Sequence, residues 1–451
     1  MADVTRRIGL SLGADLCWPL CYEEILARFD ARIPVGKDLV RFAVERVSIE
    51  PFDLRQPCKY DMVLDRLTHW YHTSREWIKK SIVMDGLYVF NNPWAIQSME
   101  KHTTYAAMMA LGFPIPDTWM IPPKSYETKP DLGVTLERYA KMFDLGKIGA
   151  ELGYPMYMKP YDGGGWQGVS RIDDEAALRA AYENSGTHVM HLQKAIEPFD
   201  HFVRAIGLGP QVRIVRYDPS LPLHDRYTMD QGFASADDVR MLTDMTLTIN
   251  AFFGWDFNSC EALLKGGTWH PIDFANACPD SQVTSLHYHF PWLVLANLEW
   301  SLFVAATKRP MRPTLDWAPF QAIAREKAPF AEKLAAYAAI ARGRLDADRF
   351  AEFKAKHLGG LAETAFEFFG TEKAKEAVRL KTAAMYPAHE VEEFTELFWS
   401  RIQRWRDDEA AGAAAASTGS ARASAPESAD QAAAPKKPRA RRAPAAKAKA
   451  R

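Results

Sequence analysis

The sequence predicts a mixed α/β fold of α+β type, and three features of its patterning support this prediction. Strand-like and helix-like segments alternate over residues 6–92, which is typical of a small parallel α/β unit. Strand pairs joined by tight, glycine-containing turns follow before residue 285. Residues 286–410 then show helical periodicity, and residues 411–451 form a tail that is poor in large apolar side chains.

Residues 1–92 are predicted to form an N-terminal α/β domain, because strand-length apolar runs alternate there with an amphipathic stretch. The predicted strands are "RIGLSLG", "RFAVERVSIEPFDL", "YDMVLDRL" and "LYVFNNP", with a helix in "HWYHTSREWIKKSIVMDG". Cys17 and Cys21 form a CxxxC pair. Since no second pair of ligands accompanies them, we interpret them as small core residues rather than a zinc site.

Residues 93–285 combine helices with strand pairs. The predicted helices are "WAIQSMEKHTTYAAMMALG", which Gly112 ends, an amphipathic stretch near 136–152, and "DDVRMLTDMTLTINAFFG". The predicted strands lie in "YPMYMKPYDGGGWQGVSRI", "THVMHLQKAI", "HFVRAIGLGPQVRIVRYDP" and "FNSCEALLKGGTWHPIDFAN". The last of these reads as a hairpin whose turn is Gly266-Gly267.

The composition is that of a soluble globular protein, with 47% hydrophobic and 25% charged residues among 451. No apolar run approaches the roughly 20 residues that span a bilayer, and the N-terminus lacks the apolar core of a secretory signal. Five scattered cysteines indicate reduced thiols and a cytoplasmic location. We therefore expect a protein that does not bind membranes.

Positive charge is concentrated in the tail. Residues 411–451 hold nine Lys/Arg and two Asp/Glu, a net charge of +7, so residues 1–410 carry −8 of the total of −1. A segment of this composition cannot bury a core and is predicted to be disordered. Its role stays open between contact with an acidic or nucleic-acid partner and a solubilising extension.

The first candidate site is "MKPYDGGGWQGVS". Lys159 ends an apolar strand, and Gly163, Gly164, Gly165 and Gly168 follow it. Such a loop exposes several backbone N–H groups to one anion, and the lysine adds a point charge, so the segment is suited to phosphate. The order of residues is not that of a Walker loop, and a flexible hairpin tip is the alternative.

Two further segments carry polar groups at strand ends. In "HLQKAIEPFDHF", Gln193, Glu197 or Asp200 could reach an amino group or ribose hydroxyls, although a plain surface loop is the alternative. In the hairpin, Glu261 and Asp273 come from neighbouring strands and would repel each other unless a divalent cation lay between them. With Asn276 they form an oxygen-ligand set that suits Mg²⁺, although a turn in which Asp and Asn bond their own backbone is the alternative.

The order of these motifs resembles the ATP-grasp superfamily, which includes D-alanine–D-alanine ligase, glutathione synthetase and the enzymes that add glutamate to ribosomal protein. It comprises the lysine-bearing helix before "LGFPIPDT", then "YPMYMKP" with its glycine-rich loop, "HLQKAI" and "CEALL…PIDFAN". The resemblance implies a two-lobed ATP-grasp domain over residues 93–285. The N-terminal unit would be the α/β domain that precedes the grasp in that family, and residues 286–410 match nothing in it.

The resemblance also implies roles for individual residues. Lys101 and Lys159 would bind the α- and β-phosphates of ATP, and the loop with Gly163, Gly164, Gly165 and Gly168 would close over them. Gln193 and the backbone of Lys194 to Ile196 would bind adenine, and Asp200 or Glu197 would bind the ribose. Glu261, Asp273 and Asn276 would bind the metal, Mg²⁺ or alternatively Mn²⁺. Arg213 and Arg216 lie where the family places an arginine that steadies the γ-phosphate, although a solvated strand face explains them equally well.

The implied chemistry is attack of a carboxylate on the γ-phosphate, followed by capture of the acyl phosphate by an amine or a related nucleophile. Its substrates would be small molecules or peptide termini. The alternatives are a phosphotransferase on the same fold and a nucleotide-binding regulatory or scaffold protein. One departure matters, because this chain has Asp-x-x-Asn where the family usually has Glu-x-Asn, a bulge-sized insertion. Oligomerisation stays open, with residues 286–410 as one surface for it.

Overall fold

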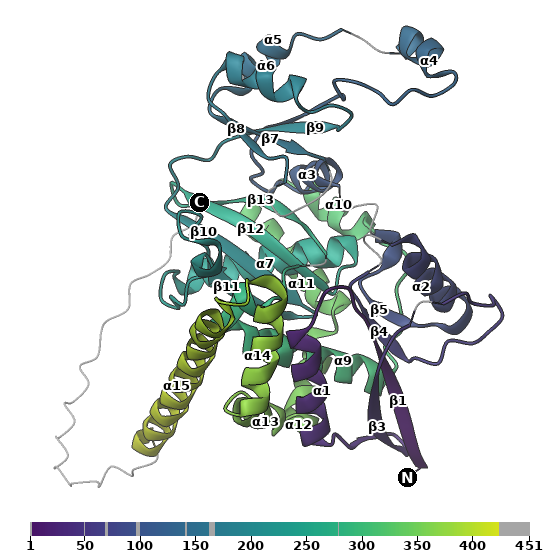
Figure 1. The fold of residues 1–451 in the computed structure, drawn as a ribbon, viewed down its shortest axis with the longest axis vertical. Helices are drawn as coiled ribbons and strands as arrows, with labels where there is room; N and C mark the ends of the chain where they lie inside the picture. Colours follow the sequence, from purple (N-terminus) through teal and green to yellow (C-terminus); the bar gives the residue numbers. More distant parts are fainter. Residues whose placement is uncertain are drawn as a thin grey trace, which may run out of the picture. The chain divides into compact units, whose positions relative to one another are not determined.

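A computed structural model describes residues 2–48, 50–67, 71–95, 100–139, 142–161, 167–277 and 279–423. Residues 1–406 form one compact unit, and residues 407–451 form a second unit. The first unit holds three sheets and the helices that cover them (Figure 1), so the predicted mixed α/β class is confirmed.

The first sheet belongs to the N-terminal segment. It has the order β2-β3-β1-β4-β5, and its strands are β1 (Ala2–Ser11), β2 (Ile33–Val35), β3 (Asp38–Arg46), β4 (Met62–Asp65) and β5 (Tyr88–Phe90). Pairing is parallel except for the short edge strand β2, which the sequence analysis missed. Helices α1 (Cys17–Phe29) and α2 (His72–Asp85) accompany it, and both cysteines of α1 are buried, as predicted.

The second sheet is antiparallel, with the order β6-β9-β7-β8. Its strands are β6 (Thr118–Ile121), β7 (Met156–Pro160), β8 (Ser170–Ile172) and β9 (Met190–Lys194). Apolar side chains such as Met158 and Leu192 pack with α5 (Leu145–Leu152) and α6 (Glu175–Glu183) on one face. The single helix predicted near 136–152 is instead two, α4 (Leu132–Tyr139) and α5, because Asp144 accepts a hydrogen bond from the N–H of Lys147 and caps a new start.

The third sheet is also antiparallel, with the order β11-β10-β12-β13. Its strands are β10 (His201–Leu208), β11 (Gln211–Arg216), β12 (Phe257–Lys265) and β13 (Thr268–Asn276), as the sequence predicted. The turn residues Gly266 and Gly267 have φ of 57° and 77°, which glycine adopts without strain. Helix α7 (Ala236–Phe253) packs on one face of this sheet.

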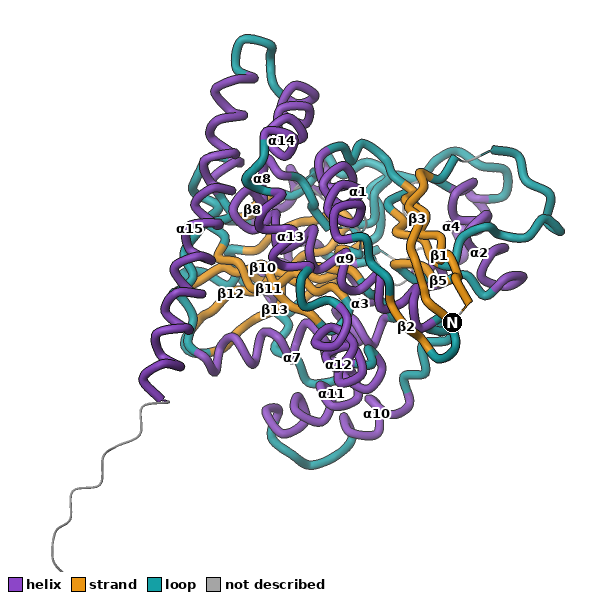
Figure 2. The backbone as a smooth tube through the Cα atoms, turned by 90° about the horizontal axis from the view of Figure 1, so that it is seen from below, coloured by secondary structure: helices purple, strands orange, loops and turns teal. Residues whose placement is uncertain are grey.

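Most of the remaining helices pack on a sheet or on another helix. The remaining helices are α3 (Lys101–Ala110), α8 (Val283–Leu286), α9 (Phe290–Thr307), α10 (Ala318–Ala324), α11 (Phe330–Arg344), α12 (Ala347–His357), α13 (Leu361–Phe368), α14 (Glu372–Met385) and α15 (Val391–Ala423), with one-turn 3-10 helices at Leu223–Asp225 and His287–His289. Helix α9 packs against β1, β4 and β10 and so joins the first and third sheets (Figure 2).

One expectation from the sequence was wrong. Residues Val283–Thr307 form a stretch of 25 residues that is long and apolar enough to cross a membrane. Within the protein 83% of its most apolar window is buried, so the hydrophobicity of this segment is explained by its position as a core helix.

The predicted domain boundaries stay predictions, since the packing is continuous across the positions where they fall. One cluster of buried side chains includes Tyr88 of β5, Ile206 of β10 and Trp300 of α9. Helix α11 likewise packs along α7. Residues 286–406 therefore complete the cores of the two preceding segments.

Helix α15 extends beyond the predicted start of the disordered tail. Its backbone is helical to Ala423, whereas the composition led us to expect disorder from residue 411. Alanine has the highest helix propensity, and no proline occurs before Pro426, so this stretch can continue a helix without a tertiary partner. The rest of the predicted tail lies outside the described residues.

A buried polar network ties the N-terminal sheet to the helices. The Tyr88 hydroxyl donates to Asp256 (2.8 Å), and Trp300 Nε1 donates to the same carboxylate (3.2 Å). Arg309 donates to the Tyr88 hydroxyl and binds Asp346 (2.8 Å), and it is only 7% exposed. The positive charge of Arg309 therefore compensates the carboxylates of both Asp256 and Asp346.

Replacing Arg309 by Met should lower the free energy of unfolding by about 3 kcal/mol, because Asp256 and Asp346 would lose their buried cation. The matched control is Arg379→Met, which removes an exposed helix pair with Glu376 and should change stability by less than about 0.5 kcal/mol. Urea unfolding measures both variants, and equal losses would contradict the assignment.

Candidate functional site

The hairpin of β12 and β13 brings two acids face to face. Glu261 pairs directly with Asp273, and the register shifts on either side of Glu261, so the inserted residue is accommodated as a bulge. Their side chains are 16% and 23% exposed. Burial raises the pKa of Glu261. Burial also acts to raise the pKa of Asp273, but the positive charges of Lys101 and Lys159 outweigh it and leave that pKa below its ordinary value.

Both predicted phosphate lysines reach this hairpin. Lys101, in the first turn of α3, places Nζ 2.7 Å from Asp273 Oδ2. Lys159, at the end of β7, donates to Gln193 Oε1 (2.7 Å) and to the carbonyl oxygen of Ile272 (3.3 Å). Burial lowers the pKa of Lys159 to about 8. Helix α3 and the second sheet therefore both contribute cations to the carboxylate pair.

Asn276 lies opposite Ser259, one register shift away from the acids, and a residue that the sequence analysis missed holds it there. The backbone N–H of Asn276 donates to Asn258 Oδ1 (2.9 Å), and Asn258 Nδ2 donates to the carbonyl oxygen of Phe274 (3.0 Å). The Asn276 amide also donates to the carbonyl oxygen of Ser259 (3.2 Å). Asn258 is fully buried, and its hydrogen bonds join β12 to β13 at the bulged end of the hairpin.

Of the residues suggested for adenine and ribose, Gln193 contacts the phosphate lysine Lys159, whereas Glu197 is bonded to other side chains. Gln193 is buried, accepts from Lys159 and donates to the Thr118 hydroxyl (3.1 Å), so it lies within the site. Glu197 accepts from Tyr157 (2.6 Å) and pairs with Arg171 (3.0 Å), which holds its pKa below the ordinary value. The side chains of Lys194 and Asp200 are exposed, and Ile196 is half-buried.

The two predicted arginines lie on opposite faces of the third sheet. Arg213 pairs with Ile206 and Arg216 with Val203, and strand residues alternate between faces. Arg213 therefore shares the face of Glu261, whereas Arg216 points to the other face and pairs with Asp230 (3.0 Å).

A third arginine, which the sequence analysis did not select, lies directly beside the acids. Arg204 pairs in register with Glu261, its guanidinium is 3.9 Å from that carboxylate, and it donates to Ser259 (3.0 Å) and to the Tyr227 hydroxyl. A charged residue in the otherwise apolar strand "HFVRAIGL" was the signal that could have revealed it.

The glycine-rich loop is described only in part. Gly163, Gly164 and Gly165 lie outside the described residues. Gly168 has φ of 69°, and a Cβ added there would approach the Pro160 ring at 3.2 Å. The position therefore favours glycine on both backbone and steric grounds.

The donor set fits a hard divalent cation. Among the residues that the structure describes, Asp273 Oδ1 is a buried oxygen without a hydrogen-bond partner, and Glu261 faces it across the hairpin. The described residues contain no cluster of three His, Cys, Asp or Glu side chains that could hold a metal. Asn276 stays the third ligand that the family resemblance implies. Two carboxylates and one amide suit Mg²⁺ better than a soft metal.

His287 and His289, which follow the hairpin, are buried rather than exposed to a substrate. His289 Nε2 contacts the carbonyl oxygen of Thr228 at 2.8 Å, and the His287 ring accepts from the N–H of Tyr288 at 2.7 Å. Burial lowers the pKa of both. These contacts indicate a structural role for the two histidines.

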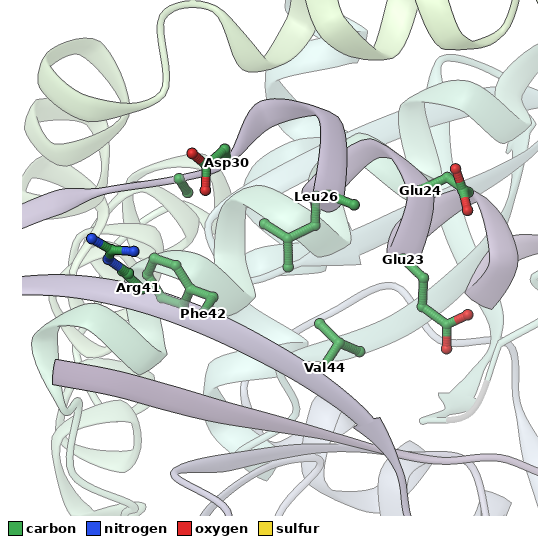
Figure 3. Close-up of a pocket in the computed structure, with 9 residues that line it drawn as sticks. Glu23, Glu24, Leu26, Asp30, Arg41, Phe42 and Val44 are labelled. Carbon is green, nitrogen blue, oxygen red and sulfur yellow. The ribbon is translucent and has the colours of Figure 1, made fainter.

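A pocket of about 500 Å³ lies elsewhere, between α1 and β3 (Figure 3). Glu23 of the helix, Asp30 directly after it and Arg41 of the strand border it. Each already has an ion-pair partner, respectively Arg46, Arg32 and Asp3. This pocket is therefore separate from the carboxylates of the hairpin and offers no uncompensated charge.

No family model matches the chain. The D-alanine–D-alanine ligase of Dechloromonas aromatica (strain RCB) is 27% identical over 149 residues, which is 32% of this chain and 48% of that protein. The match thus spans about half the length of this curated relative.

Solved structures with partial likeness include three ligases or ligase-like proteins. An ATP-grasp RimK domain protein from Sphaerobacter thermophilus is 15% identical, with 61% of this chain and 92% of that chain covered and a TM-score of 0.42. D-alanine–D-alanine ligase from Bacillus anthracis, complexed with ATP, is 12% identical (76% and 99% covered, TM-score 0.42). VanG D-Ala:D-Ser ligase from Enterococcus faecalis is 12% identical (75% and 100% covered, TM-score 0.40).

D-alanine–D-alanine ligases belong to the superfamily that the motif order resembles, so the sequence match confirms the resemblance of this chain to ATP-grasp proteins.

Replacing Lys159 by Met should stabilise the nucleotide-free protein by roughly 1–3 kcal/mol at pH 7, because folding lowers the pKa of this lysine from 10.5 to about 8. As the pH rises, Lys159 loses its proton in the folded state before it does so in the unfolded state. The destabilisation by buried, protonated Lys159 is therefore complete below pH 8 and disappears near pH 10.5. Urea unfolding at pH 7 and 9.5 measures it, with the exposed Lys147→Met as control. A less stable variant at pH 7 would contradict the prediction.

Replacing Asn258 by Ala should lower the free energy of unfolding by about 1–3 kcal/mol, because the Asn276 N–H and the Phe274 carbonyl would lose a buried partner. It should also move the Mg²⁺ dependence of nucleotide binding to higher concentration. The exposed Asn184→Ala is the control and should change neither quantity. Unaltered Mg²⁺ dependence in a folded Asn258→Ala protein would show that Asn258 does not position Asn276.

Proposed function

We propose that the chain is an ATP- and Mg²⁺-dependent ligase that joins a carboxylate to an amine or a related nucleophile through an acyl phosphate. The observation that carries this proposal is the convergence of Lys101 and Lys159 on the carboxylate pair Glu261–Asp273. Opposed acids with an unpartnered oxygen suit a cation, and adjacent lysines suit phosphates.

In the proposed reaction, a carboxylate oxygen of the substrate attacks the γ-phosphorus of ATP, and the bond to the β–γ bridging oxygen breaks, so ADP leaves. The amine nitrogen then attacks the acyl carbon and loses a proton, and the bond to phosphate oxygen breaks. The products are an amide, ADP and inorganic phosphate. Bound Mg²⁺ would neutralise charge on the β- and γ-phosphate oxygens.

The residues of the chain would act by position and charge rather than as nucleophiles. Lys101 and Lys159 would exchange Asp273 and Gln193 for phosphate oxygens, and the phosphate charge would keep Lys159 protonated despite its burial. Arg204 is the described cation closest to Glu261 and would stabilise negative charge developing at the γ-phosphate. Arg213 shares this sheet face and is the second candidate for that role.

Two alternatives use the same residues. A phosphotransferase would release ADP with a phosphorylated product and no amine requirement. A regulatory or scaffold protein would bind nucleotide without turnover, but it has no need of an opposed carboxylate pair held at the cost of burial. The identity of the acid and the amine, the cytoplasmic location and the partner of the basic tail stay predictions from the sequence.

Replacing Asp273 by Asn should reduce turnover at least about 100-fold while leaving the fold intact, because the pair would lose half of its negative charge and with it the cation. Release of ADP and of phosphate from the purified full chain, screened against pooled carboxylates and amines, measures the activity. The exposed Asp237→Asn is the control.

Mg²⁺-dependent binding of ATP that is unchanged in Asp273→Asn would refute the metal assignment. Phosphate release that needs a carboxylate but no amine would favour the phosphotransferase. Tight ATP binding without ADP release from any pool would favour the regulatory protein.

A further inference from the structure

His191 is a buried side chain that none of the roles above explains. It lies on β9, is 0% exposed, and pairs in register with Lys159 of β7. Residues that pair directly in an antiparallel sheet project from the same face, and Gln193, two residues further on, shares that face. His191 therefore lies on the same face as the predicted phosphate lysine and the predicted adenine contact, opposite α5 and α6.

Neither ring nitrogen of His191 has a hydrogen-bond partner among the described residues. Its ring neighbours are His102 (5.6 Å between centroids) and Tyr105 (5.9 Å), both on α3. The charged groups that act on it are Lys159, Lys101 and Asp273, together with His102. A buried imidazole usually satisfies at least one nitrogen within the protein, and leaving both unpaired costs free energy.

The fold could have avoided that cost with an apolar residue, as it does at the flanking buried positions Met190 and Leu192. Those two residues face the helices α5 and α6 and belong to the apolar core of the sheet. His191 projects from the opposite face, which also carries Lys159 and Gln193. We infer that a ligand on this face supplies the hydrogen-bond partner of the imidazole.

We propose that His191 is a nucleotide-binding residue that donates a ring N–H to a phosphate oxygen of ATP beside Lys159. This inference rests on the proposed function.

Three features fit this role. Burial lowers the pKa of His191 to about 3, so the ring is neutral and carries one N–H donor at physiological pH. Lys101 and Lys159 are near enough to act on the ring electrostatically, and phosphate oxygens bound to them would lie near it. A neutral donor adds a hydrogen bond to an anion without adding a third buried positive charge beside two lysines.

The test compares His191→Leu with His188→Leu, an exposed histidine just before the same strand, in the full-length protein. Calorimetric titrations with Mg²⁺–ATP, Mg²⁺–ADP and adenosine measure affinity. His191→Leu should weaken ATP and ADP binding about tenfold, as expected for one hydrogen bond to a charged group, and should leave adenosine binding unchanged. His188→Leu should match the wild type throughout.

Two further measurements keep the inference testable if that variant does not fold. His191→Asn keeps an N–H donor and should recover part of the lost affinity. In the wild type labelled with ¹⁵N-histidine, one His191 ring resonance should shift on addition of Mg²⁺–ADP but not of adenosine.

The outcomes separate this inference from the proposed function. Absence of ATP binding by the wild type overturns both. Wild-type binding with an unaffected His191→Leu variant and an unmoved ¹⁵N resonance overturns only the role of His191. An equal loss of affinity for adenosine and ADP overturns the phosphate contact.

Discussion

The structure of the site depends on the pairing of β12 with β13, which fixes Glu261 directly opposite Asp273. Two acids held this way repel each other in a protein interior, so neighbouring cations have to compensate their charge. Lys101, Lys159 and Arg204 do so from three different elements. The tight Gly266-Gly267 turn sets the register of the hairpin, and Asn258 maintains the pairing where the bulge interrupts it.

The compensating charges also explain why the segments of the chain pack as one unit. Lys101 comes from a helix and Lys159 from the second sheet, while the acids and Arg204 belong to the third. Helix α9 then joins the third sheet to the N-terminal one through a shared apolar core. The helical segment that matched nothing in the resembled family is therefore required for the cores of the others.

Sequence patterns recovered much of this arrangement where the signal is local. The hairpin, the strand ending in Lys159 and the order of the motifs could all be read from apolar periodicity and turn residues. Arg204, Asn258 and His191 were missed because the role of each depends on residues of other strands or helices, which its own segment does not specify. The faces of Arg213 and Arg216 depend on the register with β10, which their own strand does not encode.

The sequence by itself determined the mixed α/β class, the hairpin and the acidic and basic residues of the candidate site, because these follow from periodicities of two and 3.6 residues and from turn chemistry. Only the tertiary structure decided that Asp273 takes Lys101 as its partner, and that a bulge absorbs the extra residue before Asn276. It also decided that His191 is buried without a partner among the described residues. Those facts depend on contacts between residues far apart in the chain, and no local pattern specifies such contacts.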